Sequence, residues 1–230
     1  MVSSVQPARQ QVPRTEAFLE AIGTWIRGHR QAAIYLGVAI GVVALVAAWS
    51  VWSSRQAETR AAEQLSQAQF ALETQNLPLA ASEFARVAEN YSGTRAAAHA
   101  TVLLAKVRLL QGQNEQTVAV LRDFAPGADT RYRAQALSLL AAAYENLGRW
   151  REGALAYEQA AEAALWPFLE AQFLLDAGRD WVAAGDTSRA VANFQRIVAD
   201  FAETGPVIEA EIRLGELTPT GPRVGDRTPS

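Results

Sequence analysis

Residues 139–163 have the sequence LLAAAYENLGRWREGALAYEQAAEA, and residues 174–198 have the sequence LLDAGRDWVAAGDTSRAVANFQRIV. In each stretch an apolar-rich segment ends at a glycine, and a second segment with helical apolar spacing follows a short turn. Gly148 and Gly185 align at a separation of 37 residues. Each stretch therefore predicts two antiparallel helices, because glycine readily adopts the left-handed backbone conformation that ends a helix.

The same register extends upstream and predicts about four helix pairs. Large apolar residues recur at separations of 37, 36 and 37 residues, each sixteen positions after a small residue. The large residues are Phe84, Leu121, Tyr157 and Phe194, and the small ones are Ala68, Ala105, Ala141 and Gly178. One helix pair cannot bury its apolar face alone, so neighbouring pairs stack and share a core. The fold class predicted is an all-α solenoid.

Composition excludes several kinds of chemistry. The 230 residues include no cysteine, which rules out disulfides and zinc–thiolate sites. The two histidines, His29 and His99, lie on opposite sides of an apolar run at residues 32–52. No phosphate-binding glycine loop or nucleophile motif is present. Residues 53–230 carry 17 basic and 22 acidic side chains, which argues against nucleic acid as a partner. We therefore predict no enzyme, no cofactor and no metal site.

Residues 32–52 form an apolar run without a charged side chain. Twenty-one helical residues span about 31 Å, enough to cross a bilayer. Tryptophans on both flanks fit an interfacial aromatic belt. Val46-Ala47-Ala48 leaves open a cleaved signal peptide, but the run is too long and lies too far into the sequence for the usual signal. A single membrane helix is the favoured interpretation.

Arginines on the N-terminal side of this run predict a cytoplasmic N-terminus and a large domain on the far side of the membrane. The arginines that favour this orientation are Arg9, Arg14, Arg27 and Arg30, against Arg55 and Arg60 beyond the run. Within the run, Ala33, Gly37 and Gly41 make a stripe of small residues. Such a stripe allows close packing of another membrane helix, although small residues are common in membrane helices without that role.

The remaining segments complete the predicted organisation. Residues 1–14 and 218–230 are polar and proline-containing and are expected to be disordered tails. Residues 15–31 show apolar side chains at helical spacing, which predicts an amphipathic helix on the membrane surface, or alternatively a docking helix for a cytosolic partner. The repeat domain occupies residues 53–217, and its last apolar stretch, 207–217, is expected to be a helix that closes the stack.

The repeated pattern resembles the tetratricopeptide repeat, TPR, most closely in the two stretches quoted first. The earlier units depart from it at Gln75, Arg108 and Thr117, where the motif prefers glycine, an aromatic residue and alanine. The resemblance implies a curved stack whose first helices line a concave, partner-binding groove. The candidate groove residues are His99, Lys106, Gln135, Ser138, Glu145, Asn146, Gln172 and Arg179.

The full layout resembles the YfgM-type ancillary subunits of the bacterial SecYEG translocon, over about residues 15–217. That resemblance implies a single-pass inner-membrane protein with a periplasmic TPR domain. Its partners would be translocon subunits, periplasmic chaperones or exported chains. The alternative is a self-associating envelope organiser, serving cell-wall, division or outer-membrane assembly, and a homo-oligomer stays open in either case. Fold analogy alone does not establish function.

Two aspartates and two tryptophans of the repeat domain have the residue type of a site but favour simpler interpretations. Asp176 and Asp180 lie one helical turn apart, and we expect them on a solvated face rather than in a catalytic or metal site. Trp150 is expected to pack at a helix start. Trp166, before Pro167, is expected to be exposed in a turn, with a partner contact as the alternative to a plain surface position. Because cationic and amide groups are sparse on the predicted groove, we expect broad contacts rather than a clamp for a chain-terminal carboxylate.

Overall fold

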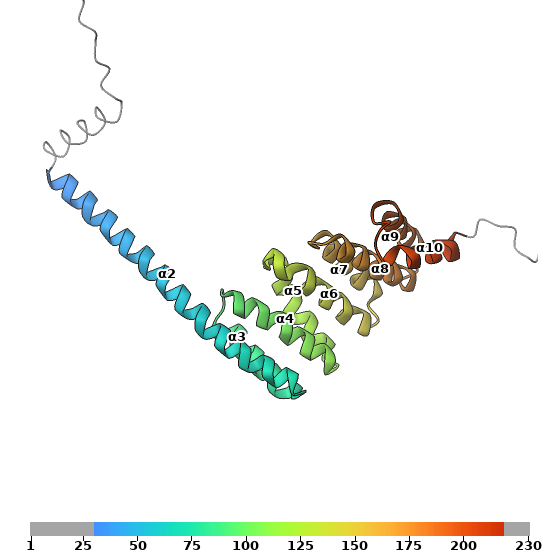
Figure 1. Ribbon diagram of the computed structural model, residues 1–230, viewed down its shortest axis with the longest axis horizontal. Helices are drawn as coiled ribbons and strands as arrows, with labels where there is room; N and C mark the ends of the chain where they lie inside the picture. Colours follow the sequence, from blue (N-terminus) through green and yellow to red (C-terminus); the bar gives the residue numbers. More distant parts are fainter. Residues whose placement is uncertain (1–29, 219–230) are drawn as a thin grey trace, which may run out of the picture. The chain divides into compact units, whose positions relative to one another are not determined.

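The computed structural model describes residues 30–218, and within that range all regular structure is helical. The all-α prediction is confirmed (Figure 1). The elements are α2 (Arg30–Glu73), α3 (Leu77–Asn90), α4 (Arg95–Leu110), α5 (Asn114–Phe124), the 3₁₀ turn η1 (Ala125–Gly127), α6 (Thr130–Asn146), α7 (Trp150–Glu162), α8 (Pro167–Ala183), α9 (Thr187–Asp200) and α10 (Pro206–Leu217).

The chain divides into two compact units, residues 1–55 and 56–230. Among the described residues of the first unit, the side chains of α2 between residues 34 and 52 are exposed, although most are large and apolar. α2 is the one helix in the described range that is long and apolar enough to cross a membrane. The predicted surface helix 15–31 and both tails lie outside the described residues, apart from Arg30, Gln31 and Thr218.

The second unit is a stack of helix pairs in the register that the sequence predicts. The C-terminal part of α2 pairs with α3, and α4–α5, α6–α7 and α8–α9 follow, with α10 packed on α8 and α9 (Figure 1). Every repeated small and large position is buried. The small positions are Ala68, Ala105, Ala141 and Gly178, and the large positions are Phe84, Leu121, Tyr157 and Phe194.

Glycines end the first helix of three pairs, as expected. Gly112, Gly148 and Gly185 have φ angles of 72°, 68° and 79°, in the left-handed region. The next residue then donates its N–H to a carbonyl five positions back, as Arg149 does to Tyr144 at 2.9 Å, which satisfies a helix-terminal acceptor. Gln75 occupies the same place in the first pair with φ 58°. A side chain in this region costs about 1–2 kcal/mol, so the first turn is strained.

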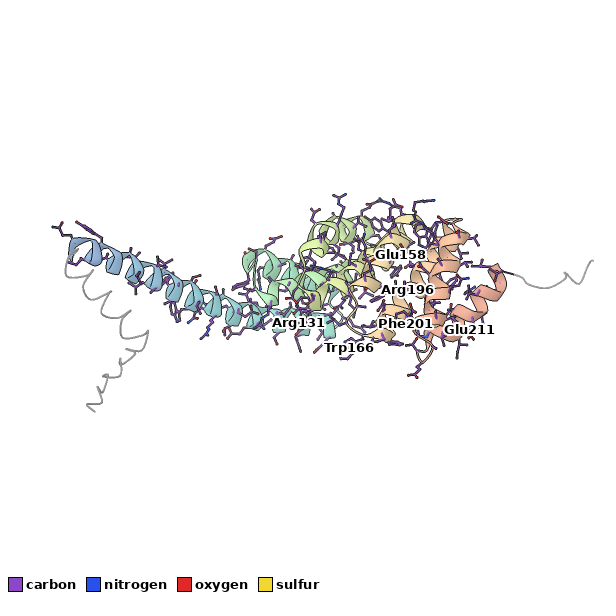
Figure 2. The ribbon with its side chains drawn as sticks, turned by 90° about the horizontal axis from the view of Figure 1, so that it is seen from above. Arg131, Glu158, Trp166, Arg196, Phe201 and Glu211 are labelled. Carbon is purple, nitrogen blue, oxygen red and sulfur yellow. The ribbon has the colours of Figure 1, made fainter. Side chains whose placement is uncertain are left out.

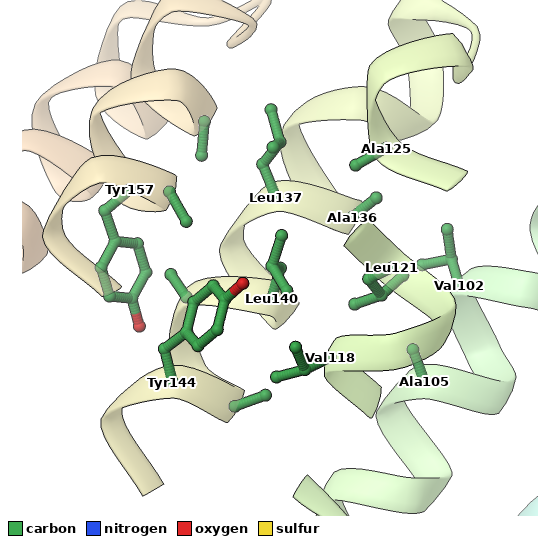
Figure 3. Close-up of a cluster of buried hydrophobic side chains, with 14 of the residues drawn as sticks. Val102, Ala105, Val118, Leu121, Ala125, Ala136, Leu137, Leu140, Tyr144 and Tyr157 are labelled. Atoms are coloured by element: carbon green, nitrogen blue, oxygen red, sulfur yellow. The ribbon is translucent and has the colours of Figure 1, made fainter. Parts of the chain in front are cut away.

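Alanine-rich contacts and a few large side chains make up the core. Figure 3 shows Val118 and Leu121 of α5 packed between α4 and α6, with Leu137 and Leu140 of α6 on the other side. The last pair buries Trp181 and Phe194 in a separate cluster with α10. The stack holds neighbouring helices at fixed separations, and this positions the polar side chains described below.

Candidate functional site

Three of the eight groove candidates meet at one polar cluster between α6 and α8. Tyr157 donates its hydroxyl proton to Glu145 at 2.7 Å. The amide of Gln172 donates to Asp176 at 3.2 Å, and the Arg179 guanidinium donates to the same carboxylate at 3.0 Å. We call the set Glu145, Tyr157, Gln172, Asp176, Arg179 and Asp180 the α6–α8 polar cluster.

Arg179 also connects the cluster to the closing helix. Its Nε and Nη2 donate to the two carboxylate oxygens of Glu209 on α10, each at 3.1 Å. A bidentate pair of this kind fixes both side chains more firmly than a single contact. Arg179 therefore ties α8 to α10, and its guanidinium is already engaged by two carboxylates.

Asp180 lies at the buried end of this cluster, and its expected place on a solvated face was wrong. Its exposed fraction is 2 %, and its Oδ2 has no hydrogen-bond partner among the described residues. Burial, together with the charge and hydrogen bond of Glu145, raises the pKa of Asp180 to about 8. The error arose because the pattern along α8 does not show that α6 and α7 cover that face.

Burial shifts the pKa values of two further members of the cluster. Burial raises the pKa of Asp176, and burial with the nearby Glu145 carboxylate raises that of Tyr157. His99 lies apart from it, stacked on Tyr132 with ring centroids 5.7 Å apart. In the described range no three His, Cys, Asp or Glu side chains are grouped so as to hold a metal ion.

Gly153 on α7 makes room for the Asp180 carboxyl. A Cβ atom at this position would lie 2.3 Å from Oδ2 of Asp180 and 3.5 Å from the Ala141 carbonyl oxygen. We expect Gly153→Ala to lower the free energy of unfolding by about 1–3 kcal/mol, because a buried carboxyl has little room to move. Urea denaturation followed by circular dichroism measures the change.

Gly215→Ala on α10 is the matched control for this substitution. Nothing lies within 4 Å of a Cβ placed there. Alanine in an exposed helix position is expected to leave stability unchanged or to raise it by up to about 1 kcal/mol. Equal losses in the two variants would show that Gly153 does not accommodate Asp180.

The other candidate residues lie outside the α6–α8 polar cluster, at several different positions. Lys106 on α4 is exposed and makes no ion pair in the part of the chain that the structure describes. Asn146, at the end of α6, donates to Asn114, at the start of α5 in the neighbouring pair, at 3.1 Å. The side chains of Ala33 and Gly37 are not among those described, while Gly41 has open space around it. The small-residue stripe therefore stays a prediction.

Gln135 and Ser138 line a pocket beside Trp166, which we call the Trp166 pocket. Its volume is about 330 Å³, and Figure 2 shows Arg131 and Trp166 on the same side of the repeat domain. The lining residues are Thr130, Arg131, Ala134, Gln135, Ser138, Leu165, Trp166, Leu169 and Phe173. The sequence indicated that Trp166 would be exposed, but not that α6 would supply the opposite wall.

Comparisons with known proteins agree on the fold. The sequence matches no protein-family profile and none of the curated proteins. One similar structure, from Podosopora anserina, consists of TPR-like repeats that are nearly identical to one another. Its sequence is 18 % identical to that of this chain, the TM-score is 0.56, and the match covers 70 % of this chain and 85 % of that one.

Two further structures are similar as well. A tetratricopeptide repeat protein from Parabacteroides merdae is 13 % identical over 68 % of this chain and 59 % of its own, with a TM-score of 0.57. A double mutant of MamA RS-1 is 18 % identical over 84 % of this chain and 96 % of its own, with a TM-score of 0.51. At these identities the likeness concerns the fold alone, and this chain has the TPR-like helical-repeat fold.

Proposed function

We propose that this protein is a membrane-anchored scaffold that holds other proteins beside a membrane. The observation that supports this most strongly is the combination, in one chain, of an exposed apolar helix segment long enough to span a bilayer and a TPR-like stack. TPR-like folds generally mediate contacts between proteins.

The finer proposal places the protein in the bacterial inner membrane, with the N-terminus cytoplasmic and the repeat domain periplasmic. Arginines before residue 32 support this orientation. The resemblance to YfgM-type subunits supports a place beside the translocon, where the candidate groove would contact translocon subunits, periplasmic chaperones or exported chains. The groove would act by contact and positioning, and no bond in a bound protein would be made or broken.

Lys106→Glu is the sharpest test of the candidate groove. Lys106 is the only lysine in the chain, is exposed and has no described ion pair, so its reversal leaves the fold intact. Arg179 is a poorer probe because its loss would also break the Glu209 contact. We expect Lys106→Glu to reduce severalfold the proteins that co-purify with the detergent-solubilised full chain, as quantified by mass spectrometry.

Arg122→Glu provides the matched control, since Arg122 is exposed on α5, the second helix of its pair. This variant should retain the co-purifying proteins. An unchanged set of partners in Lys106→Glu would contradict the groove at this position, and equal losses in both variants would indicate a general charge effect.

A second candidate function is self-association, favoured by the outer face of α10. Ile208 and Ile212 lie one turn apart and are 65 % and 57 % exposed, whereas the end of a repeat stack is usually polar. Native mass spectrometry in detergent distinguishes the two functions. A stable homo-oligomer that Ile212→Lys or Gly41→Leu dissolves supports self-association, and a monomer supports the scaffold.

A further inference from the structure

The Trp166 pocket presents an apolar surface that the fold leaves uncovered. Trp166 is 68 % exposed, and Leu165 beside it is 59 % exposed. Leu169 and Phe173, on the next two turns of α8, form the floor. Large aromatic side chains in such positions are enriched among the residues that contribute most to protein binding. Nothing in the packing of the stack itself requires a tryptophan here.

The main chain of Trp166 has a fixed conformation before any partner binds. Trp166 is the residue before α8 and has φ −129° and ψ 132°, the extended conformation to which a following proline restricts its neighbour. Its carbonyl oxygen also accepts the Glu170 N–H at 3.0 Å. Because the backbone is fixed by Pro167 and the helix start, little conformational entropy is lost when a partner packs against the ring.

The charge of the residues that line the pocket indicates which kind of partner segment it can bind. Arg131, at the start of α6, is the one charged side chain that lines it. Its side chain is 60 % exposed and forms a long ion pair with Asp129, at 3.7 Å and without a side-chain hydrogen bond, which leaves the guanidinium accessible to a second carboxylate. Gln135 and Ser138 add uncharged polar groups on the α6 wall, suited to the backbone of a bound chain. An arginine beside an apolar floor complements a carboxylate next to an apolar side chain.

We propose that the Trp166 pocket binds an acidic segment of a partner protein, with one apolar or aromatic side chain against Trp166 and a neighbouring carboxylate on Arg131. This inference rests on the proposed scaffold function and specifies the chemistry of one of its contacts. It adds Leu165, Trp166, Leu169, Phe173 and Arg131 to the binding surface, at a place separate from Lys106 and from the α6–α8 polar cluster.

Fluorescence polarisation with labelled peptides tests the proposal on the full chain in detergent micelles. The probes are three pools of short peptides, acetylated and amidated so that no terminal charge contributes. One pool has phenylalanine or leucine flanked by glutamates, the second replaces the glutamates with lysines, and the third replaces the apolar residue with serine. We expect the acidic apolar pool to bind at least about tenfold more tightly than either of the others.

Two variants with matched controls locate the binding. Trp166→Ala is expected to weaken binding of the acidic pool about tenfold or more, while Phe168→Ala, an exposed aromatic outside the lining, leaves it unchanged. Arg131→Glu is expected to reverse the preference toward the lysine pool. Arg122→Glu changes a similarly exposed arginine elsewhere, which also forms a 3.7 Å ion pair with a nearby aspartate, and should retain the acidic preference.

The results separate this inference from the proposed function. Equal affinity for acidic and lysine pools, or unchanged affinity in Trp166→Ala, overturns the inference, as does the absence of binding by every pool. Lys106→Glu can still lose its co-purifying proteins in that case, and the scaffold then stands. If acidic peptides bind at Trp166 but Lys106→Glu keeps all its partners, the inference stands and the candidate groove is contradicted at Lys106 alone.

Discussion

Alanine in place of Trp181 is expected to lower the free energy of unfolding of the repeat domain by about 3–5 kcal/mol. Trp181 has an exposed fraction of 0 % and lies where α7, α8 and α9 meet. Truncating a buried tryptophan loses the transfer free energy of the ring and leaves a cavity that the neighbouring helices fill only in part. No other described side chain of this size is as fully buried.

Polar contacts of the indole add to this loss. Its Nε1–H donates to Glu158 at 2.7 Å, and the guanidinium of Arg189 lies 4.5 Å from the ring centroid. In the Trp181→Ala variant, Glu158 loses the indole donor and keeps the Asn193 amide, which donates to it at 3.0 Å. Leaving a partly buried carboxylate without one of its hydrogen bonds destabilises the folded state by more than that hydrogen bond contributed.

Urea denaturation of the full chain in detergent, followed by circular dichroism, measures this effect. Trp166→Ala is the matched control, because it removes the same side chain from an exposed site. Surface substitutions of this kind usually change stability by less than about 0.5 kcal/mol. Similar losses in the two variants would contradict the assignment of Trp181 to the core.

Asp180→Asn is expected to remove a pH dependence of stability from the repeat domain. Asp180 is protonated in the folded chain up to about pH 8, whereas in the unfolded chain it ionises near pH 3.8. Between these values the folded state binds one more proton, so the free energy of unfolding falls as the pH rises. The fall attributable to this group is several kcal/mol over the interval, at most about 1.4 kcal/mol for each pH unit between the two pKa values.

Asparagine has nearly the same shape as the protonated carboxyl and no proton to lose. The variant should therefore match the native chain near pH 4 and exceed its stability near pH 8, the two ends of this interval. Denaturation midpoints at a series of pH values measure the difference. Asp123→Asn, an exposed aspartate on α5, should leave the slope unchanged. A native chain equally stable at both ends of the interval would contradict the buried, protonated state of Asp180.

The sequence predicted those features that depend on positions along one helix pair. Gly148 and Gly185 end helices because their backbone conformation excludes most other residues, and Tyr157 and Phe194 are buried where the register places them. These choices are local and recur in every repeat, so a single chain shows them. Gln75 is an exception, because it adopts the left-handed conformation although it is not a glycine.

The apolar spacing along a single helix does not predict features that depend on contact between repeats. Asp180 has the spacing of a surface residue on α8, and only Gly153 on α7 and Glu145 on α6 make its site buried and acidic. The Trp166 pocket similarly needs Arg131 and Gln135, more than 30 positions upstream, for its second wall. Periodicity identifies which face of a helix is apolar, but not which neighbour covers a polar face.

Photo-crosslinking in cells tests the central claim most directly. A photoreactive amino acid would replace Lys106 or Gln172 on the first helices of two repeats, or Arg122 on a second helix as the control. The scaffold account predicts that positions 106 and 172 capture translocon subunits, periplasmic chaperones or exported chains, and that position 122 does not. Capture of only the protein itself, or the same captured proteins at all three positions, would contradict it.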